Sequence, residues 1–198
     1  MNADKGSLRD LITAWAVMTT LTLTPATLTA DPAGSGSGSG AEAGAAAPTA
    51  TTLVFDKNPD DPTDSTLSVH RNGKPRATYR AGSGLGVQDD CARAKGWLPD
   101  GNWRIRAGTR TYDGDLVKGY AVRLQDMPCS RGTVTRTEIF IHSETNRDGS
   151  EGTSEARRWD GPGDYRSNGC VKLHPADIKA MFRLLDRVGW PTHLRVVP

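Results

Sequence analysis

Two residues in the second half of the chain could perform thiol chemistry together. His142 closes the segment TEIFIHS, and Cys170 follows a glycine in RSNGCVKLHP. A cysteine is mostly protonated at neutral pH, but a nearby imidazole can take its proton and make the sulfur a nucleophile. The pattern predicts that a strand end carrying His142 meets a polar loop carrying Cys170.

The neighbours of this pair could assist such a reaction. The second ring nitrogen of His142 needs a partner that fixes its tautomer, and the carbonyl of Ser143 is a candidate. Gly169 lacks a Cβ, so the amides of Gly169 and Cys170 could approach a substrate carbonyl and bind an oxyanion. The alternative is that His142 is a structural residue and Cys170 an inert thiol.

The chain has three cysteines, which tend to pair in exported proteins. A disulfide between Cys91 and Cys129 would leave Cys170 as a free thiol. The alternative pairs Cys170 with one of the other two. Cys170 and His174 are four residues apart, but two ligands do not make a zinc site and C-x-x-C spacing is absent. We therefore expect no metal and no cofactor.

Short strands should position these residues. Asn72-Gly73, between two alternating runs, predicts a β-hairpin. The segments GNWRIRAG, GYAVRLQD, TEIFIHS and THLRVVP predict further strands. Short strands joined by turns, with one late helix, indicate a mainly β sandwich or barrel.

Alternation within TEIFIHS directs Ile139 and Ile141 to one face of the strand and Phe140 and His142 to the other. The segment 144–166 that follows shows no apolar periodicity. Loops of this length are uncommon in compact domains and often bind ligands.

One helix is predicted after Cys170. Pro175 suits its first position and Gly189 its end. Between them, apolar residues recur at helical spacing and should face the core, namely Ile178, Met181, Phe182 and Leu185.

The organisation of the chain suggests export. Residues 1–30 resemble a signal peptide or membrane leader, with Lys5 and Arg9 before an apolar, threonine-rich stretch. Residues 31–52 have the composition of a flexible linker, and residues 53–198 are the predicted domain. The formal net charge is only +2 and basic blocks are absent, so we expect no nucleic-acid partner.

The motifs IFIHS and SNGCVKLHP resemble those of the L,D-transpeptidase catalytic domain (YkuD-type) family of bacterial cell-wall enzymes, in which a histidine at a strand end precedes Ser-x-Gly-Cys. GSGLG at 82–86 and WLPDGNWRI at 97–105 resemble earlier segments of that family. The resemblance covers residues 53–198. It implies a mainly β domain with one α-helix in its C-terminal half.

The resemblance implies an exported peptidoglycan L,D-transpeptidase. Cys170 would attack the third residue of a tetrapeptide stem, release D-Ala, and pass the acyl group to an amine of a second stem. His142 would be general base and acid, Ser143 its carbonyl partner, and Gly169 with Cys170 the oxyanion site. The residues expected to contact the substrate or brace the site are Ser167, Asn168, Lys172, Tyr165, Arg166 and Trp159.

Several positions depart from the family pattern. Asn168 stands where many members have histidine, and Lys172 where arginine or asparagine is common. Leu98 and Asp100 replace two threonines, and the segment between the histidine and the cysteine is longer. The departures concern substrate choice, because the thiol and the imidazole are kept.

Other functions fit parts of the pattern. Hydrolysis of the acyl enzyme would make the protein an L,D-carboxypeptidase. A sortase-like transpeptidase would use Arg183 or Arg195 as a third residue, and a non-catalytic wall-binding module would leave Cys170 unused. For the preferred function we expect a monomer outside the cytoplasm that acts on peptidoglycan stem peptides and is acylated by carbapenem β-lactams. It would be attached to the membrane only if the leader is retained.

Overall fold

The computed structural model describes residues 50–198. The predicted leader, and the predicted linker up to residue 49, lie outside the described residues. The first strand begins at Thr51, two residues before the expected start of the domain. Thr51 and Thr52 already pair with Arg71 and His70 of the next strand, so they belong to the folded sheet.

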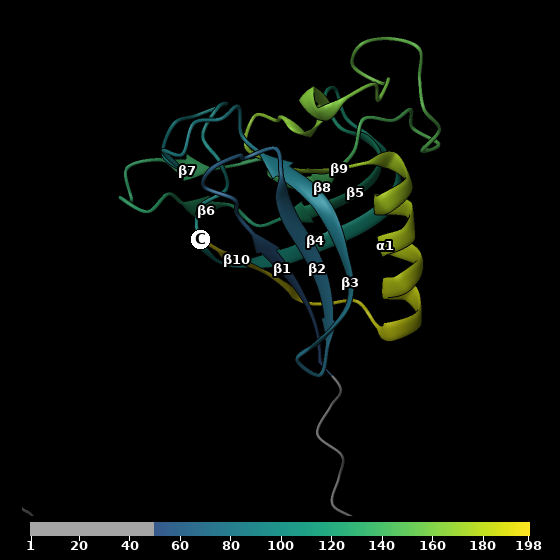
Figure 1. Cartoon of the computed structure of the whole chain (residues 1–198), viewed down its shortest axis with the longest axis horizontal. Helices are drawn as coiled ribbons and strands as arrows, with labels where there is room; N and C mark the ends of the chain where they lie inside the picture. Colours follow the sequence, from purple (N-terminus) through teal and green to yellow (C-terminus); the bar gives the residue numbers. More distant parts are fainter. Residues whose placement is uncertain (1–49) are drawn as a thin grey trace, which may run out of the picture. The chain divides into compact units, whose positions relative to one another are not determined.

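The core of the structure is a closed β-barrel (Figure 1). Its strands follow the order β1-β10-β4-β5-β8-β9-β3-β2, and the pairs β1–β10 and β8–β9 are parallel. The strands are β1 (Thr51–Asp56), β2 (Ser65–Arg71), β3 (Lys74–Ser83), β4 (Gly101–Asp113), β5 (Lys118–Leu124), β8 (Phe140–His142), β9 (Val171–Leu173) and β10 (His193–Val197). The prediction of a mainly β barrel with one α-helix in the C-terminal half is confirmed.

The predicted hairpin is the β2–β3 turn. Asn72 and Gly73 have φ values of 54° and 73°, the left-handed pair that a two-residue turn of this kind requires. Asparagine and glycine tolerate this backbone best, which explains why the local sequence identified the turn.

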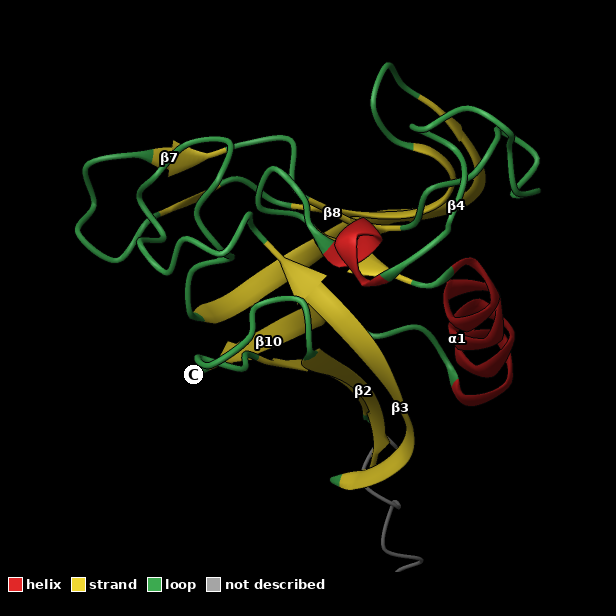
Figure 2. Ribbon diagram, turned by 45° about the horizontal axis from the view of Figure 1, so that its top comes forward, coloured by secondary structure: helices red, strands yellow, loops and turns green. Residues whose placement is uncertain are grey.

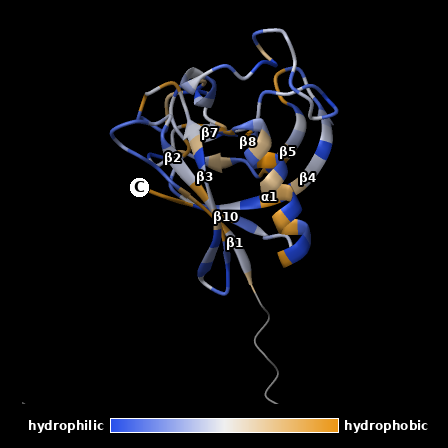
Figure 3. Ribbon diagram, turned by 45° about the vertical axis from the view of Figure 1, so that its right-hand side comes forward, coloured by the Kyte–Doolittle hydropathy of each residue, from blue (hydrophilic) through white to orange (hydrophobic). Residues whose placement is uncertain are grey.

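The predicted helix is α1 (Pro175–Val188), and Gly189 follows its last residue. The four apolar residues expected on its inner face are fully buried in the main core cluster, and Figure 3 shows hydrophobic and hydrophilic residues along the same helix. His174 caps its N-terminus, because the His174 Nδ1 accepts a hydrogen bond from the Ala176 amide at 3.1 Å. Among residues 50–198, no helix has the length and hydropathy needed to cross a membrane.

Two smaller elements lie outside the barrel. β6 (Met127–Pro128) and β7 (Thr135–Arg136) form a two-stranded ribbon, and η1 (Pro162–Tyr165) is a short 3-10 helix in the long segment between β8 and β9. Figure 2 shows the ribbon on one side of β8 and the β4–β5 hairpin on the other.

The barrel strands separate two clusters of buried side chains. Ile139 and Ile141 belong to the main core cluster, whereas Phe140 belongs to a small cluster that also contains Val117 and Cys170. The alternation predicted for TEIFIHS is therefore confirmed, and the second face of this strand leads to the candidate site.

Candidate active site

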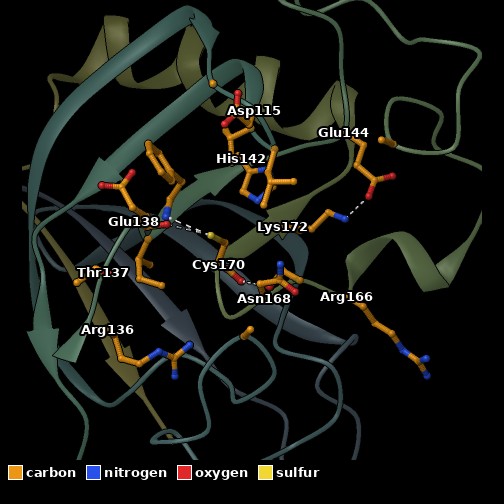
Figure 4. A pocket seen from close by; sticks show the side chains of 18 of the residues that line it. Asp115, Arg136, Thr137, Glu138, His142, Glu144, Arg166, Asn168, Cys170 and Lys172 are labelled. Carbon is orange, nitrogen blue, oxygen red and sulfur yellow. Dashed lines mark hydrogen bonds and ion pairs between the residues drawn. The ribbon is translucent and has the colours of Figure 1, made fainter. Parts of the chain in front are cut away.

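The parallel pairing of β8 with β9 brings His142 and Cys170 to one face. Ile141 pairs with Val171 and His142 with Lys172, and the side chains of Ile141 and Val171 enter the core. Because successive side chains alternate, His142 and the residue before Val171 face the other way. Both line one cavity, and Figure 4 shows both directed into it.

The cavity has a volume of about 680 Å³, within the usual range for ligand pockets. The β8–β9 pair forms its base. One wall is the end of the β4–β5 hairpin, including Tyr112 and Val117. Another is the segment 135–138, which begins with β7, and a third is the segment 166–168. The cavity is therefore bounded by segments that are far apart in the sequence.

Cys170 is a free, buried thiol with 8% of its surface exposed. As expected, Cys170 lies at the end of a loop, directly before strand β9, although its side chain is buried. The Sγ atom accepts a hydrogen bond from the Phe140 amide at 3.4 Å and donates one to the Glu138 carbonyl at 3.7 Å. Burial raises the pKa of this thiol to about 11, so the resting sulfur is protonated at neutral pH.

His142 is buried in the same cavity as this thiol and is neutral. Its Nδ1 lies 3.0 Å from the Ser143 carbonyl, which can only accept a hydrogen bond, so Nδ1 carries the proton and Nε2 is free to accept one. Burial, assisted by the charge of Lys172, lowers the pKa of His142 to about 4. The contact between His142 and the Ser143 carbonyl is the one expected from the sequence.

The turn before Cys170 is held by Ser167. Its Oγ accepts hydrogen bonds from the Gly84 and Gly169 amides, both at 3.1 Å, and donates one to the Cys170 carbonyl at 2.6 Å. Ser167 thus braces the turn. The expectation that the Gly169 amide binds an oxyanion is not supported, because this N–H is already used. The Cys170 amide remains the candidate donor.

Lys172 forms a buried ion pair with Glu144. Lys172 was expected to contact the substrate, but here its ammonium is engaged by a carboxylate of the protein. The Oε2 atom of Glu144 is buried without a hydrogen-bond partner in the structure, and burial raises the pKa of this carboxyl. The pair lies at the edge of the cavity next to His142 (Figure 4).

The remaining predicted contact residues divide into two groups. Arg166 and Asn168 line the cavity. Trp159 and Tyr165 do not: their ring centroids lie 4.8 Å apart, and the Trp159 ring packs against His174 at 5.3 Å. The expected substrate contact of these two rings is therefore not supported, because they pack together beside the start of α1 and do not line the cavity.

Cys91 and Cys129 are joined by a disulfide with an S–S distance of 2.03 Å. Within the described part of the chain, they and Asp90 form the one cluster with the geometry of a metal site. Sulfurs bonded to each other are not thiolates and do not ligate a metal.

Comparison with known proteins assigns the family. The L,D-transpeptidase catalytic domain (YkuD) matches residues 60–192, more than half of the chain.

The chain belongs to the L,D-transpeptidase catalytic domain family.

Among solved structures, this domain is similar to Mycobacterium tuberculosis L,D-transpeptidase 1, with 18% identity over 75% of this chain and 62% of that one and a TM-score of 0.41. The LD transpeptidase LdtMt1 in complex with imipenem is 19% identical over 74% of this chain and 59% of that one, with a TM-score of 0.45. An L,D-transpeptidase of Xylanimonas cellulosilytica is 15% identical over 76% of this chain and 63% of that one, with a TM-score of 0.38. The chain thus spans about three fifths of these proteins. No curated protein matched it.

Three residues of this candidate site were not predicted from the sequence. Glu138 contacts the thiol through its carbonyl, Glu144 pairs with Lys172, and Arg136 lies against the Gly169 turn. Alternation continued two residues beyond His142 would have suggested that Glu144 lies near the site. No local signal identifies Arg136, because its position depends on contacts with a distant loop.

Proposed function

We propose that Cys170 is the nucleophile of this L,D-transpeptidase domain and that His142 is its general base. One observation carries the proposal: the β8–β9 pairing directs a free thiol and an imidazole with an unprotonated Nε2 into the same cavity. Thiol and imidazole are both neutral at rest, so proton transfer would accompany attack on the substrate.

Acylation would begin at the third residue of a tetrapeptide stem. The thiol proton moves to His142 Nε2, the sulfur bonds to the carbonyl carbon, and the Cys170 amide faces the developing oxyanion. The C–N bond to the terminal D-Ala then breaks, and the imidazolium returns the proton to the leaving amine. The product is a thioester on Cys170.

Transfer would follow by the reverse use of the same groups. The amine of a second stem attacks the thioester and gives a proton to His142. The C–S bond breaks, and the imidazolium protonates the departing sulfur. The two stems are then joined by an amide bond, and the resting thiol and imidazole are restored.

The cavity walls support a substrate of this kind. Arg166 lines the cavity and forms no ion pair within residues 50–198, which leaves its guanidinium for a carboxylate of the stem. Asn168 lies beside it and offers amide hydrogen bonds. Lys172, held by Glu144, is proposed to act on the site through its charge and not as a direct ligand.

We place this reaction outside the cytoplasm. The Cys91–Cys129 disulfide supports this location, because such bonds persist in oxidising compartments. Residues 1–30 would serve as the export signal. Mass spectrometry of the mature N-terminus would test this part of the proposal, and an uncleaved leader would indicate membrane anchoring.

The deciding experiment is covalent labelling by a carbapenem. We expect the wild-type protein to gain the mass of one carbapenem and the Cys170→Ala protein to gain none. An Arg110→Gln variant, altered at an exposed ion pair with Asp186, serves as the control and should be labelled like wild type. Labelling of folded Cys170→Ala to the wild-type extent would disprove the nucleophile assignment.

A second assay distinguishes the remaining activities. A tetrapeptide stem supplied with and without an acceptor amine separates transfer from hydrolysis, and release of D-Ala without a joined product would indicate a carboxypeptidase. Cleavage of a sorting-signal peptide would indicate a sortase-like activity. A protein that binds cell walls equally well without Cys170 and His142, and forms no thioester, would be a binding module.

A further inference from the structure

Arg136 is a buried arginine at the back of the candidate site. Only 3% of its surface is exposed, and it forms no ion pair within the described part of the chain. Its guanidinium instead donates to three backbone carbonyls: Nη1 to Asp90 at 2.5 Å and to Trp97 at 3.1 Å, and Nη2 to Gly96 at 3.1 Å. Carbonyls satisfy the N–H groups but do not neutralise the charge. Burying a cation without an ion-pair partner is costly. Burial lowers the pKa of Arg136, and the charge of the nearby Asp90 carboxylate offsets only part of that effect.

The disulfide joins the two segments that hold this arginine. The three carbonyls belong to the loop 90–97, whereas Arg136 belongs to β7 of the ribbon. Cys91 of that loop is bonded to Cys129, which directly follows β6. The Asp90 carboxylate strengthens the junction by accepting hydrogen bonds from the Ser130 amide at 3.0 Å and its hydroxyl at 2.8 Å. Loop and ribbon are thus joined by one covalent bond and by these two hydrogen bonds.

The other side of the guanidinium faces the turn that carries Cys170. Gly169 has a φ of 107°, and a Cβ at this position would overlap the Arg136 Nη2 and lie 2.9 Å from the Gly96 carbonyl. Arg136 therefore packs directly against the backbone one residue before the thiol. It also lines the same cavity. Its charge favours the ionised sulfur and counteracts the burial that raises the pKa of Cys170.

We propose that Arg136 is a positioning residue for Cys170, and that the Cys91–Cys129 disulfide holds it in place. The fixed guanidinium keeps the Gly169 turn in register and stabilises the negative charge that develops on the sulfur when its proton leaves for His142. The disulfide then controls the reactivity of the thiol as well as the stability of the fold. This inference rests on the proposed role of Cys170 as nucleophile.

Alkylation of Cys170 by iodoacetamide tests the inference without requiring transpeptidase activity. The rate is measured against pH in the full chain for wild type, Arg136→Gln and Arg136→Lys. An opposite charge nearby typically shifts a pKa by about 1–3 units, so we expect alkylation of Arg136→Gln at pH 8 to slow about tenfold or more, with the pH profile displaced upward. Arg136→Lys keeps the charge and should recover part of the rate.

The matched control is Arg131→Gln. Arg131 lies in the turn of the same ribbon but is exposed and pairs with Asp89, so its loss should leave the alkylation profile unchanged. The double variant Cys91→Ser/Cys129→Ser should slow alkylation toward the rate of Arg136→Gln. Adding the two serine substitutions to Arg136→Gln should slow alkylation little further, because both changes remove the stabilisation of the thiolate by Arg136.

A merely structural role would lower the melting temperature without displacing the pH profile. A folded Arg136→Gln protein with the wild-type profile would overturn the inference. If Arg136→Gln does not fold, the inference is tested with Arg136→Lys and the double serine variant. Wild-type pH profiles in both of these variants would overturn the inference. If the wild-type protein forms no carbapenem adduct while the variants still show displaced pH profiles, the proposed function is disproved and the role of Arg136 stands.

Discussion

The two faces of the β8–β9 pair are built from the same ladder of hydrogen bonds but have opposite properties. One face contributes Ile141 and Val171 to the main core, where apolar side chains are fully buried. The other presents His142 and Cys170 to the cavity, where burial lowers the pKa of the imidazole and raises that of the thiol. The comparison shows that one strand pair can supply stability on one side and reactive groups on the other.

Substitutions on the two faces should therefore have separable effects. A change on the core face should alter the free energy of unfolding and leave the chemistry of the folded molecules intact. A change on the cavity face should impair the chemistry without lowering the free energy of unfolding. The reason is that removing a buried titratable group also removes the cost of desolvating it.

The largest effect is expected for His142→Gln. General-base catalysis typically contributes a factor of about 10²–10⁴, so the rate of acylation by a carbapenem should fall by about that factor while the melting temperature stays close to that of wild type. Single-turnover mass spectrometry measures the rate. His193→Gln, at an exposed position on β10, should acylate normally, and an unimpaired His142→Gln protein would show that another group removes the thiol proton.

On the core face, Leu173→Ala should mainly affect stability. Leu173 is fully buried in β9, and truncating such a leucine costs about 2–5 kcal/mol. Denaturant unfolding gives this value, and the folded fraction should still be acylated at the wild-type rate. Leu116→Ala, at a side chain that is 74% exposed, should change stability by no more than about 0.5 kcal/mol. Equal losses in the two variants would contradict the comparison.

His142 should also make stability depend on pH. The folded imidazole binds a proton near pH 4, whereas the unfolded one binds near 6.5, so the unfolded state holds more protons between these values. Stability should therefore fall as pH decreases through this window, by about 3 kcal/mol from this group. Unfolding measured at pH 6.5 and pH 4 should show a drop that is smaller by this amount in His142→Gln. Parallel curves for the two proteins would place the imidazole in a less buried setting.

The smallest effect is expected for Ser143→Ala. The Ser143 hydroxyl is buried without a hydrogen-bond partner in the structure, and only its backbone carbonyl holds His142. Removing the hydroxyl should stabilise the fold by up to about 1 kcal/mol and leave the acylation rate unchanged. Ser167→Ala is the contrasting variant, because its Oγ makes three hydrogen bonds and its loss should cost about 1–3 kcal/mol. A slow Ser143→Ala enzyme would assign the hydroxyl a direct role.

Local patterns were sufficient to predict much of this molecule. The β2–β3 turn follows from Asn72 and Gly73, whose backbone preferences act within two residues. Helix α1 follows from the spacing of four apolar residues, and the two faces of β8 follow from alternation. Each of these features depends on neighbours in the sequence, which explains why the sequence alone predicts them.

Contacts between distant segments could not be predicted in the same way. The three-residue strand β9 is too short to show alternation, so the burial of Cys170 directly before it was not predicted. The engagement of Lys172 by Glu144 depends on the register of β9 against β8. The packing of Arg136 against Gly169 requires both the ribbon and the loop 90–97. In each case the partner is chosen by the fold and not by adjacent residues.

The parallel arrangement of β8 and β9 has a consequence for how such a protein can change over evolutionary time. Parallel neighbours cannot be joined by a tight turn, so the chain must cross from the end of one strand to the start of the other, and part of that crossing borders the cavity. Its two endpoints are anchored in the barrel, independently of its length. Mutation can therefore change the sequence and length of the crossing segment, and with them the molecules that enter the cavity, without changing the spacing between the sulfur and the imidazole.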